Sequence, residues 1–293
     1  MEYWNVSVPL NPDAGVYCMV TPACGPGDPV TVTLPPALVR DGLAEAGIEG
    51  AAAPLSPVGI RLAGKPALNK LDIFTNGTVE VQDEGSQLLC QLLAPKRGEM
   101  VVDFCAGAGG KTLAIGAAMR STGRLYAFDV SEKRLSNLGP RLARSGLSNV
   151  HPGRIDSEHD AKVKRLAGKI DRVLVDAPCS GLGTLRRNPD LKWRQSAQAV
   201  EEMSAKQLSI LTSAARLLKP GGRLVYATCS VLARENQQVV EQFLAAHEDF
   251  VLVPAGEVLA AQKIALEMGP YLELYPHTHQ TDGFFAAVLE RRA

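Results

Sequence analysis

The sequence lacks any apolar run approaching the roughly 18 residues that a membrane-crossing helix needs. Its first residues also lack the basic and apolar regions of a secretory signal. Because 46% of its 293 residues are hydrophobic and 21% are charged, we expect a globular protein that works in the cytoplasm and has no membrane partner. A chain of this length is expected to hold one large domain and a smaller one.

No Cys-x-x-Cys pair occurs among the six cysteines, which are scattered along the chain. This spacing indicates neither a zinc site nor a disulfide framework, so no metal is expected. An excess of charge of one sign is also missing, because Lys plus Arg and Asp plus Glu both number 31. Any nucleic acid must therefore bind to a local patch of the protein.

Composition and periodicity predict three parts. Residues 1–35 are rich in Pro and Gly without sustained periodicity, which predicts irregular structure. Residues 36–95 combine a helical run, short extended pieces and an amphipathic helix at 83–93, and so predict a small α/β lobe. Residues 96–293 are expected to form the larger domain.

The larger domain alternates short apolar runs with amphipathic segments. Helical patterns between strands predict βαβ units and hence a parallel sheet. A final run at 283–290 is apolar on both faces, which places it inside the sheet, and residues 219–222 are typical of a turn before the fifth strand. The earlier strands are expected at 100–104, 124–129, 150–154, 171–176 and 223–228.

A glycine-rich turn follows the first of these strands. A phosphate-binding P-loop would need a glycine where Cys105 stands, and the dinucleotide fingerprint would need its third glycine at Thr112. What remains is a turn that lets backbone approach a ligand closely. The turn comprises Cys105, Ala106, Gly107, Ala108, Gly109, Gly110 and Lys111.

An acidic residue, Asp129, ends the next strand. A carboxylate there can bind both hydroxyls of a ribose, which favours an adenosine cofactor without a pyrophosphate, and S-adenosylmethionine is the candidate. A structural alternative of equal weight is that Asp129 caps the helix that begins near Ser131.

Two cysteines follow neighbouring strand ends, Cys179 after Asp176-Ala177-Pro178 and Cys229 after Thr228. C5 of cytosine or uracil becomes nucleophilic enough to take a methyl group only after a thiolate adds to C6. A second thiol could help to undo this adduct, and Asp176, if burial keeps it protonated, could donate to N3. Methylation of an exocyclic amine would favour Pro-Pro-aromatic after the acid, which this sequence does not have.

A basic segment with one aromatic residue comes directly after Cys179. A loop of this composition suits contact with a phosphate backbone while the aromatic ring packs or stacks, and an ordinary solvated loop is the alternative. The expected RNA contacts are Arg186, Arg187, Lys192, Trp193 and Arg194.

Five motifs occur in the order of one known family, at residues 82–87, 103–111, 176–181, 228–230 and 282–285. Together they resemble the RsmB/Sun (NOL/NOP/Sun) family of RNA cytosine-5 methyltransferases, from about residue 54 to the C-terminus. The resemblance implies a class I, Rossmann-like methyltransferase with a mostly parallel seven-stranded sheet and a small RRM-like RNA-binding lobe before it. The family's N-terminal NusB-like domain is expected to be lacking.

The resemblance further implies roles for single residues. Cys229 would be the nucleophile and Cys179 would assist release of the methylated RNA. Asp176 would lie between cofactor and base, and the turn with Lys111, also expected in catalysis, would hold the methionine side. Asp129 would bind the ribose. Asp156, with Asp160 as a rival, would contact the adenine side.

One position of the turn departs from the family. Ala108 replaces the proline that usually precedes the paired glycines, which leaves the loop less stiff. We expect a monomer that uses S-adenosylmethionine to methylate C5 of cytosine in ribosomal RNA. Transfer RNA is an alternative substrate, and a non-catalytic assembly factor of the same fold is an alternative function.

Overall fold

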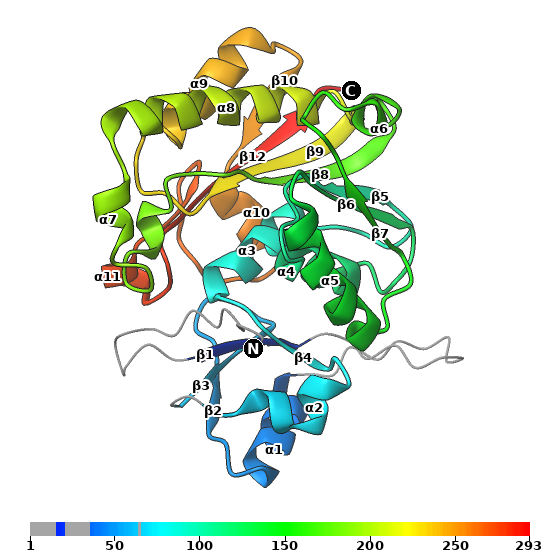
Figure 1. Ribbon diagram of the computed structural model, residues 1–293, viewed down its shortest axis with the longest axis vertical. Coiled ribbons are helices and arrows are strands. Elements are labelled where there is room, and N and C mark those ends of the chain that lie inside the picture. Colours follow the sequence, from blue (N-terminus) through cyan, green and yellow to red (C-terminus); the bar gives the residue numbers. More distant parts are fainter. Residues whose placement is uncertain (1–15, 21–35, 64–65) are drawn as a thin grey trace.

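The computed structural model describes residues 16–20, 36–63 and 66–293. A large domain with a central sheet occupies the upper part of Figure 1, and a small lobe lies below it. No described helix is long and apolar enough to span a bilayer.

The large domain consists of α3 (Glu84–Leu93), β5 (Met100–Asp103), α4 (Gly110–Ala118), β6 (Arg124–Asp129), α5 (Glu132–Ser145), β7 (Val150–Arg154), α6 (Ala161–Lys164), β8 (Ile170–Asp176), α7 (Leu191–Arg194), α8 (Ala197–Ala215), β9 (Leu218–Thr228), α9 (Gln237–Ala246), β10 (Phe250–Val253), α10 (Ala255–Ala261), β11 (Leu272–Leu274), α11 (Pro276–His279) and β12 (Phe284–Arg291).

The central sheet has the strand order β10-β12-β9-β8-β5-β6-β7, with the short β11 paired to β12. Strands β5 to β9 run parallel to their neighbours in this group, whereas β12 runs antiparallel between β9 and β10. The predicted Rossmann-like sheet is therefore confirmed, with β11 as an eighth strand beside the seven-stranded path. The last strand lies inside the sheet, as its two apolar faces predicted.

Strand β9 begins earlier than expected. The residues predicted as a turn, 219–222, lie within it, and Gly221 has a φ of 75° there. The pairing of β8 with β9 shifts its register between Ile170 and Arg172. A bulge of this kind accommodates residues that would otherwise end a strand. Residues 219–222 become part of the strand because β8 pairs with β9, and the sequence of residues 219–222 alone does not reveal this pairing.

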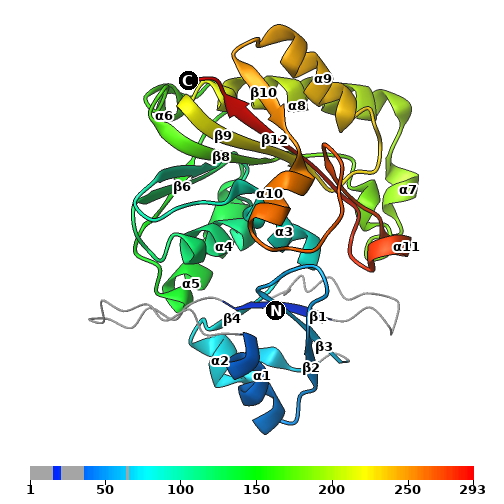
Figure 2. The same ribbon diagram turned by 180° about the vertical axis from the view of Figure 1, so that it is seen from behind.

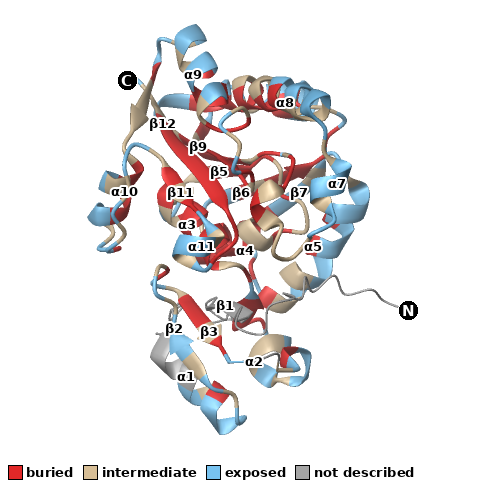
Figure 3. Ribbon diagram, turned by 90° about the vertical axis from the view of Figure 1, so that its left-hand side faces the viewer, coloured by how far each residue is buried: buried red, intermediate tan, exposed pale blue. Residues whose placement is uncertain are grey.

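Helices cover both faces of the sheet. Helices α3, α4 and α10 lie on one face, and α8 and α9 lie on the other (Figures 1 and 2). Successive strand residues enter opposite layers: Val101 packs with the first group of helices and Val102 with the second. Figure 3 shows the buried strands between these layers. With both faces covered, the strand ends next to the β5–β8 pair remain open for a ligand.

The small lobe is an antiparallel four-stranded sheet with two helices. Its strand order is β2-β3-β1-β4, and its element order, β-α-β-β-α-β, is that of the ferredoxin-like motif. Val39, Leu43 and Ile60 belong to its core. The elements are β1 (Val16–Val20), α1 (Pro36–Glu45), β2 (Gly50–Ala52), β3 (Gly59–Leu62), α2 (Asp72–Thr75) and β4 (Val79–Val81).

Strand β1 corrects the expectation that residues 1–35 are irregular. It pairs with β3 on one side and with β4 on the other, so the lobe includes residues before 36. A five-residue run between Pro- and Gly-rich segments has too little local pattern to be recognised, and its pairing partners are distant in sequence. Residues 1–15 and 21–35 lie outside the described residues. RNA binding by this lobe stays a prediction.

The lobe docks on α5 of the large domain. Glu80 of β4 pairs with Arg144 at 2.5 Å and with Arg141 at 3.3 Å. The guanidinium of Arg144 also lies 4.2 Å from the centre of the Phe74 ring, a cation–π distance. The carbonyl of Arg144 approaches Gly77 so closely that a Cβ at Gly77 would lie 2.3 Å from it.

The close approach at Gly77 predicts a specific stability defect. Gly77→Ala adds both the strain of a positive φ (78°) and a backbone clash, whereas Gly98→Ala adds only the strain, because φ is 81° and no atom lies within 4 Å. We expect Gly98→Ala to lower the unfolding free energy by about 1 to 2 kcal/mol. Gly77→Ala should lower it by about 1 to 3 kcal/mol more. Urea unfolding measures both, and equal losses would contradict the observed docking contact.

Candidate active site

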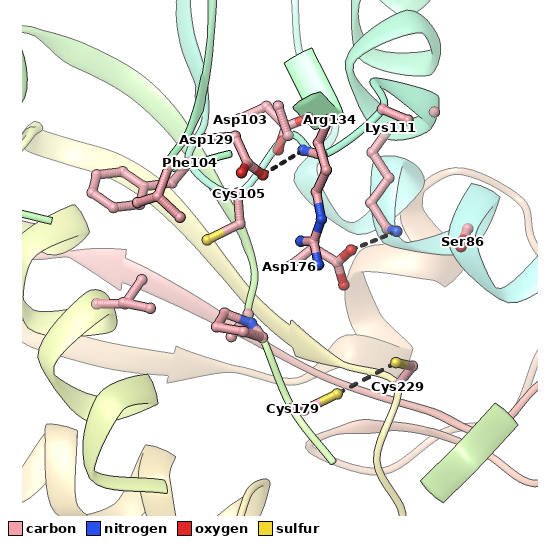
Figure 4. Close-up of a pocket in the computed structure, with 18 of the residues that line it drawn as sticks. Ser86, Asp103, Phe104, Cys105, Lys111, Asp129, Arg134, Asp176, Cys179 and Cys229 are labelled. Atoms are coloured by element: carbon pink, nitrogen blue, oxygen red, sulfur yellow. Dashed lines mark hydrogen bonds and ion pairs between the residues drawn. The ribbon is translucent and has the colours of Figure 1, made fainter. Parts of the chain in front are cut away.

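A cavity of about 700 Å³ opens at the carboxyl ends of β5, β6, β8 and β9 (Figure 4). Each of these ends contributes a polar side chain: Asp103, Asp129, Asp176 and Cys229 in that order. The cavity brings together most of the residues predicted from the sequence. Those that line it are Cys105, Ala106, Gly107, Ala108, Gly110, Lys111, Asp129, Asp176, Cys179 and Cys229.

The glycine turn adopts a conformation that its glycines permit. Gly107 and Gly109 have φ angles of 56° and 86°, and a Cβ at Gly109 would lie 2.2 Å from Leu138 of α5. Helix α4 begins directly after Gly109, which brings its first amides to the cavity wall. The carbonyl of Ala108 accepts a hydrogen bond of 2.6 Å from Arg141. Arg141 therefore anchors the turn at the position where the family usually has proline.

Asp129 ties the turn to β6. One carboxylate oxygen accepts from the Gly107 amide at 2.8 Å and the other from the Ser131 amide at 2.7 Å. The N-cap of α5 is Ser131, whose side chain accepts from the Arg134 amide. The capping alternative for Asp129 therefore does not hold. Asp129 is 5% exposed and lines the cavity, where its remaining lone pairs can accept from a ligand.

Asp156 does not reach the cavity, contrary to expectation. Its side chain is 81% exposed and pairs with Arg154 at 3.0 Å. The rival Asp160 caps α6 instead. Because β7 ends at Arg154, the next residue, Ile155, turns inward and lines the cavity, and Glu158 lines it further along. Which of these successive residues turns inward depends on the chain path after β7, which an acidic residue in the sequence does not reveal.

Lys111 and Asp176 form an ion pair of 2.7 Å across the cavity (Figure 4). Burial works to lower the pKa of Lys111, but the Asp176 carboxylate outweighs it and the pKa ends above its ordinary value. The Asp176 carboxylate thus has a cationic partner at the cavity wall. A proton for a bound base would have to come by way of Lys111.

Asp103 was not predicted as a site residue, although it ends β5. It is fully buried, and one carboxylate oxygen accepts from Thr112 at 2.7 Å. The other oxygen has no hydrogen-bond partner among the described residues. Burial raises the pKa of Asp103 to about 7. An orphaned acceptor at the cavity wall can bind a cationic or N–H donor group of a ligand.

Gln82, like Asp103, has a buried acceptor atom at the cavity. It lines the cavity, is 8% exposed, and its Oε1 is buried without a partner in the described part of the chain. Ser86, in the first turn of α3, also lines the cavity. Both belong to the 82–87 motif that the sequence singled out without assigning it a contact.

The two cysteines lie side by side at one end of the cavity (Figure 4). Their sulfur atoms are 3.3 Å apart and each side chain is half-buried. The hydrogen bond to the Cys229 sulfur, together with burial, raises the pKa of Cys179 well above its ordinary value. Cys179 thus keeps its proton and can donate it to Cys229.

The side chains of the basic segment, residues 186–194, differ in whether they are paired inside the protein or exposed. Arg186 and Arg187 both pair with Asp83 and Asp282 at 2.7 to 3.2 Å, and their side chains are only 18% and 16% exposed. Their charge is used inside the protein, which corrects the expectation that they lie along RNA. Two separate carboxylates, 199 residues apart, create this cluster, so the local composition could not reveal it.

Lys192, Trp193 and Arg194 form α7 and are exposed. Trp193 is 81% exposed, and the Lys192 ammonium lies 4.9 Å from its ring centre. Arg194 pairs with the exposed Asp190. No group of three metal-ligating side chains occurs in the part of the chain that the structure describes.

The chain is similar in sequence to known methyltransferases. A family model described as 16S rRNA methyltransferase RsmB/F matches residues 90–290. The probable ribosomal RNA small subunit methyltransferase B of Synechocystis sp. is 38% identical over 254 residues, which are 86% of this chain and 57% of that protein. The ribosomal RNA small subunit methyltransferase B of Klebsiella pneumoniae is 36% identical over 260 residues, covering 85% and 55%.

A crystal structure of a methyltransferase homolog protein from Pyrococcus horikoshii shares the fold. It is 29% identical with a TM-score of 0.76, and the match covers 94% of this chain and 87% of that one. The chain spans little more than half the length of the two curated relatives. Because the family model matches more than half of the chain, and the relatives agree with it, the chain belongs to the RsmB/F family of 16S rRNA methyltransferases.

Proposed function

We propose that this protein transfers a methyl group from S-adenosylmethionine to C5 of a cytosine in RNA. The observation that carries the proposal is the pair of sulfur atoms 3.3 Å apart in the cavity that the glycine turn also lines. The curated relatives are named for the small-subunit ribosomal RNA, and we propose that RNA as the substrate here. The target base must be unpaired or flipped out to bring C6 to a sulfur atom.

The residues around the cavity fit S-adenosylmethionine. The orphaned oxygens of Asp103 and Gln82 suit the ammonium group of its methionine part, and Asp129 suits its ribose. Gly107 and Gly110 let the turn approach it without side chains in between. When bound, the cofactor supplies an electrophilic methyl group on a sulfonium.

Cys229 is the proposed nucleophile. Its thiolate adds to C6 of the cytosine, the π electrons of the C5–C6 double bond shift toward C4, and those of the C4–N3 double bond move onto N3, which takes a proton. C5 is then the nucleophilic carbon of an enamine. The Lys111–Asp176 pair offers a proton at N3 and a charge that stabilises the ring in this state. After C5 has taken the methyl group, its proton passes to a water molecule and the C5–H electron pair re-forms the C5–C6 double bond. The C6–sulfur bond then breaks with its electron pair returning to Cys229, and N3 gives its proton back to the Lys111–Asp176 pair.

Cys179 is the proposed release residue. It retains its proton and lies 3.3 Å from the sulfur that leaves C6. A thiol donor at this distance stabilises the departing thiolate, so release becomes faster than it would be without Cys179. Trp193 and Lys192, on the exposed α7, are the proposed contacts to nucleotides that flank the target base.

The two cysteines should give opposite phenotypes on mutation. Cys229→Ala should abolish methyl transfer, because no thiolate then reaches C6. Cys179→Ala should instead accumulate a covalent complex of protein and RNA, because release slows while addition continues. Labelled S-adenosylmethionine with small-subunit ribosomal RNA measures transfer, and a denaturing gel shows the complex as a slow band.

Cys90→Ala is the control for cysteine replacement. The Cys90 thiol is buried and donates to the carbonyls of Ser86 and Lys111, and it does not line the cavity, so this variant should transfer methyl groups and leave no complex. An adduct in Cys229→Ala would mean that the two roles are exchanged. Absence of transfer by the wild-type protein to ribosomal and transfer RNA alike would contradict the proposed function.

Cofactor binding should depend on pH through Asp103. Since burial raises its pKa to about 7, Asp103 is protonated at lower pH and cannot then pair with the ammonium group. We expect the affinity for S-adenosylhomocysteine to rise by up to about tenfold per pH unit as pH increases toward 7, and then to level off. Calorimetric titration from pH 5.5 to 8 measures it. Asp103→Asn should flatten the profile, and a wild-type profile that is already flat would contradict this role.

Trp193 should contribute to RNA binding and not to chemistry. Stacking on an aromatic side chain is worth about 1 to 3 kcal/mol per base, so Trp193→Ala should raise KM for RNA by roughly 5- to 150-fold at nearly constant kcat. Trp193→Phe keeps a ring and should recover most of the loss. Steady-state kinetics test both variants. An unchanged KM in Trp193→Ala would show that the ring contacts no nucleotide.

A further inference from the structure

The turn between β9 and α9 contains a carboxylate that the mechanism above does not use. Glu235 is fully buried, with no exposed surface. Its backbone carbonyl accepts a hydrogen bond of 2.6 Å from the buried Tyr226 hydroxyl, which fixes the turn against the sheet. No Lys, Arg or His pairs with its side chain among the described residues. A charged group in such a place must be held by neutral donors.

Four neutral donors surround this carboxylate. One oxygen accepts from the Ser180 amide at 2.7 Å and from Gln207 Nε2 at 3.1 Å. The other accepts from the hydroxyls of Ser180 and Ser230, each at 2.5 Å. The two hydroxyls are themselves 3.3 Å apart. The set of donors satisfies both oxygens, so burial of the charge is offset.

The two serines are the residues directly after the two cysteines. Ser180 follows Cys179 on the segment leaving β8, and Ser230 follows Cys229 on the segment leaving β9. Both serines are nearly fully buried, at 3% and 1% exposure. A single carboxylate that accepts from both therefore joins the two segments one residue beyond the sulfur atoms.

Helix α8 completes this arrangement. Gln207 donates from its Nε2 to the carbonyl of Pro178 at 2.9 Å as well as to Glu235. The segment that carries Cys179 is thereby held on both sides of the cysteine, at Pro178 and at Ser180. On the other segment, the Gly183 amide donates to the Cys229 carbonyl at 2.9 Å.

We propose that Glu235 is a positioning residue that sets the distance between the Cys179 and Cys229 sulfur atoms by accepting hydrogen bonds from Ser180 and Ser230. This assignment deepens the proposed function, on which its catalytic consequence rests. Placement of reacting groups matters because a displacement of about 1 Å can cost roughly 100-fold in rate.

The negative charge of Glu235 has a second effect on the pair. The pKa of Cys179 is raised most strongly by its hydrogen bond to Cys229 and by burial. The Glu235 carboxylate raises the pKa of Cys179 further. Tyr226 also interacts electrostatically with Cys179, and burial, its first cause, raises the pKa of the Tyr226 hydroxyl well above its ordinary value. Glu235 thus helps Cys179 to stay protonated while Cys229 reacts.

Glu235→Gln tests the proposal with little change in shape. An amide group keeps an acceptor for the Ser180 backbone amide and Gln207, but its N–H₂ faces the Ser180 and Ser230 hydroxyls, which then have to accept instead of donate. We expect kcat for methyl transfer to fall by roughly 100-fold, with KM for RNA and cofactor within about twofold of wild type. Glu99→Gln is the matched control, since Glu99 pairs with Arg172 at the opposite end of the sheet.

The distance between the sulfur atoms can be probed without RNA. Phenylarsine oxide binds two neighbouring thiols by forming two arsenic–sulfur bonds with loss of water, and Cys179→Ala defines the signal that belongs to this pair. Glu235→Gln should bind the arsenical at least tenfold more weakly than wild type, whereas Glu99→Gln should not differ. In the same variant, alkylation of Cys179 by iodoacetamide, followed by peptide mass spectrometry, should begin at lower pH.

These measurements separate a positioning role from a structural one. The proposal is overturned if Glu235→Gln binds the arsenical and alkylates like wild type, or if its kcat loss is matched by Glu99→Gln at the same thermal midpoint. If the wild-type protein methylates no RNA but the arsenical and alkylation results are as expected, the proposed function fails and the positioning role stands.

Discussion

The parallel pairing of β8 with β9 is the constraint on which the rest of the active site depends. Asp176 lies opposite Ala227 in this pairing, and the Ala177 amide donates to the Ala227 carbonyl at 2.8 Å. Neighbouring strands lie about 4.8 Å apart, so the segments leaving them start side by side. Only this register brings Cys179 and Cys229, 50 residues apart in the chain, to 3.3 Å. A shift by one residue would turn every side chain of a strand to the other face.

The electrostatics of the cavity follow from the same strand ends. Three carboxylates, those of Asp103, Asp129 and Asp176, end β5, β6 and β8, and Lys111 pairs with the third of them. The cavity is therefore suited to a ligand with positive charge near β5. Arg186 and Arg187 of the neighbouring basic segment do not alter this balance, because Asp83 and Asp282 neutralise them.

Arg141 connects the small lobe to the glycine turn. It donates to the Ala108 carbonyl and pairs with Glu80 of β4, so one side chain contacts both the cofactor turn and the lobe. The lobe is thus attached to the wall of the cavity and not only to the surface of the large domain. An ion pair this close to a turn also restrains a position where alanine leaves the backbone freer than proline would.

The sequence by itself determined the class of fold, the order of most elements, the glycine turn and the two cysteines. These features are local: a strand, a turn and a helix follow one another within some twelve residues, and periodicity reports which face is apolar. It also indicated that the last strand belongs inside the sheet. The small lobe was visible as an α/β pattern, but its first strand was not.

Tertiary structure decided which side chains meet. Asp156 carries the charge expected of a site residue, yet the chain turns after β7 so that Ile155 points inward. Arg186 and Arg187 have the composition of an RNA contact, yet two distant carboxylates bind them. Asp176 gained Lys111 as a partner, and Glu235 gained two serines from segments that only the β8–β9 register brings together. Contacts of this kind depend on pairing between residues far apart in sequence, and local pattern carries no information about that pairing.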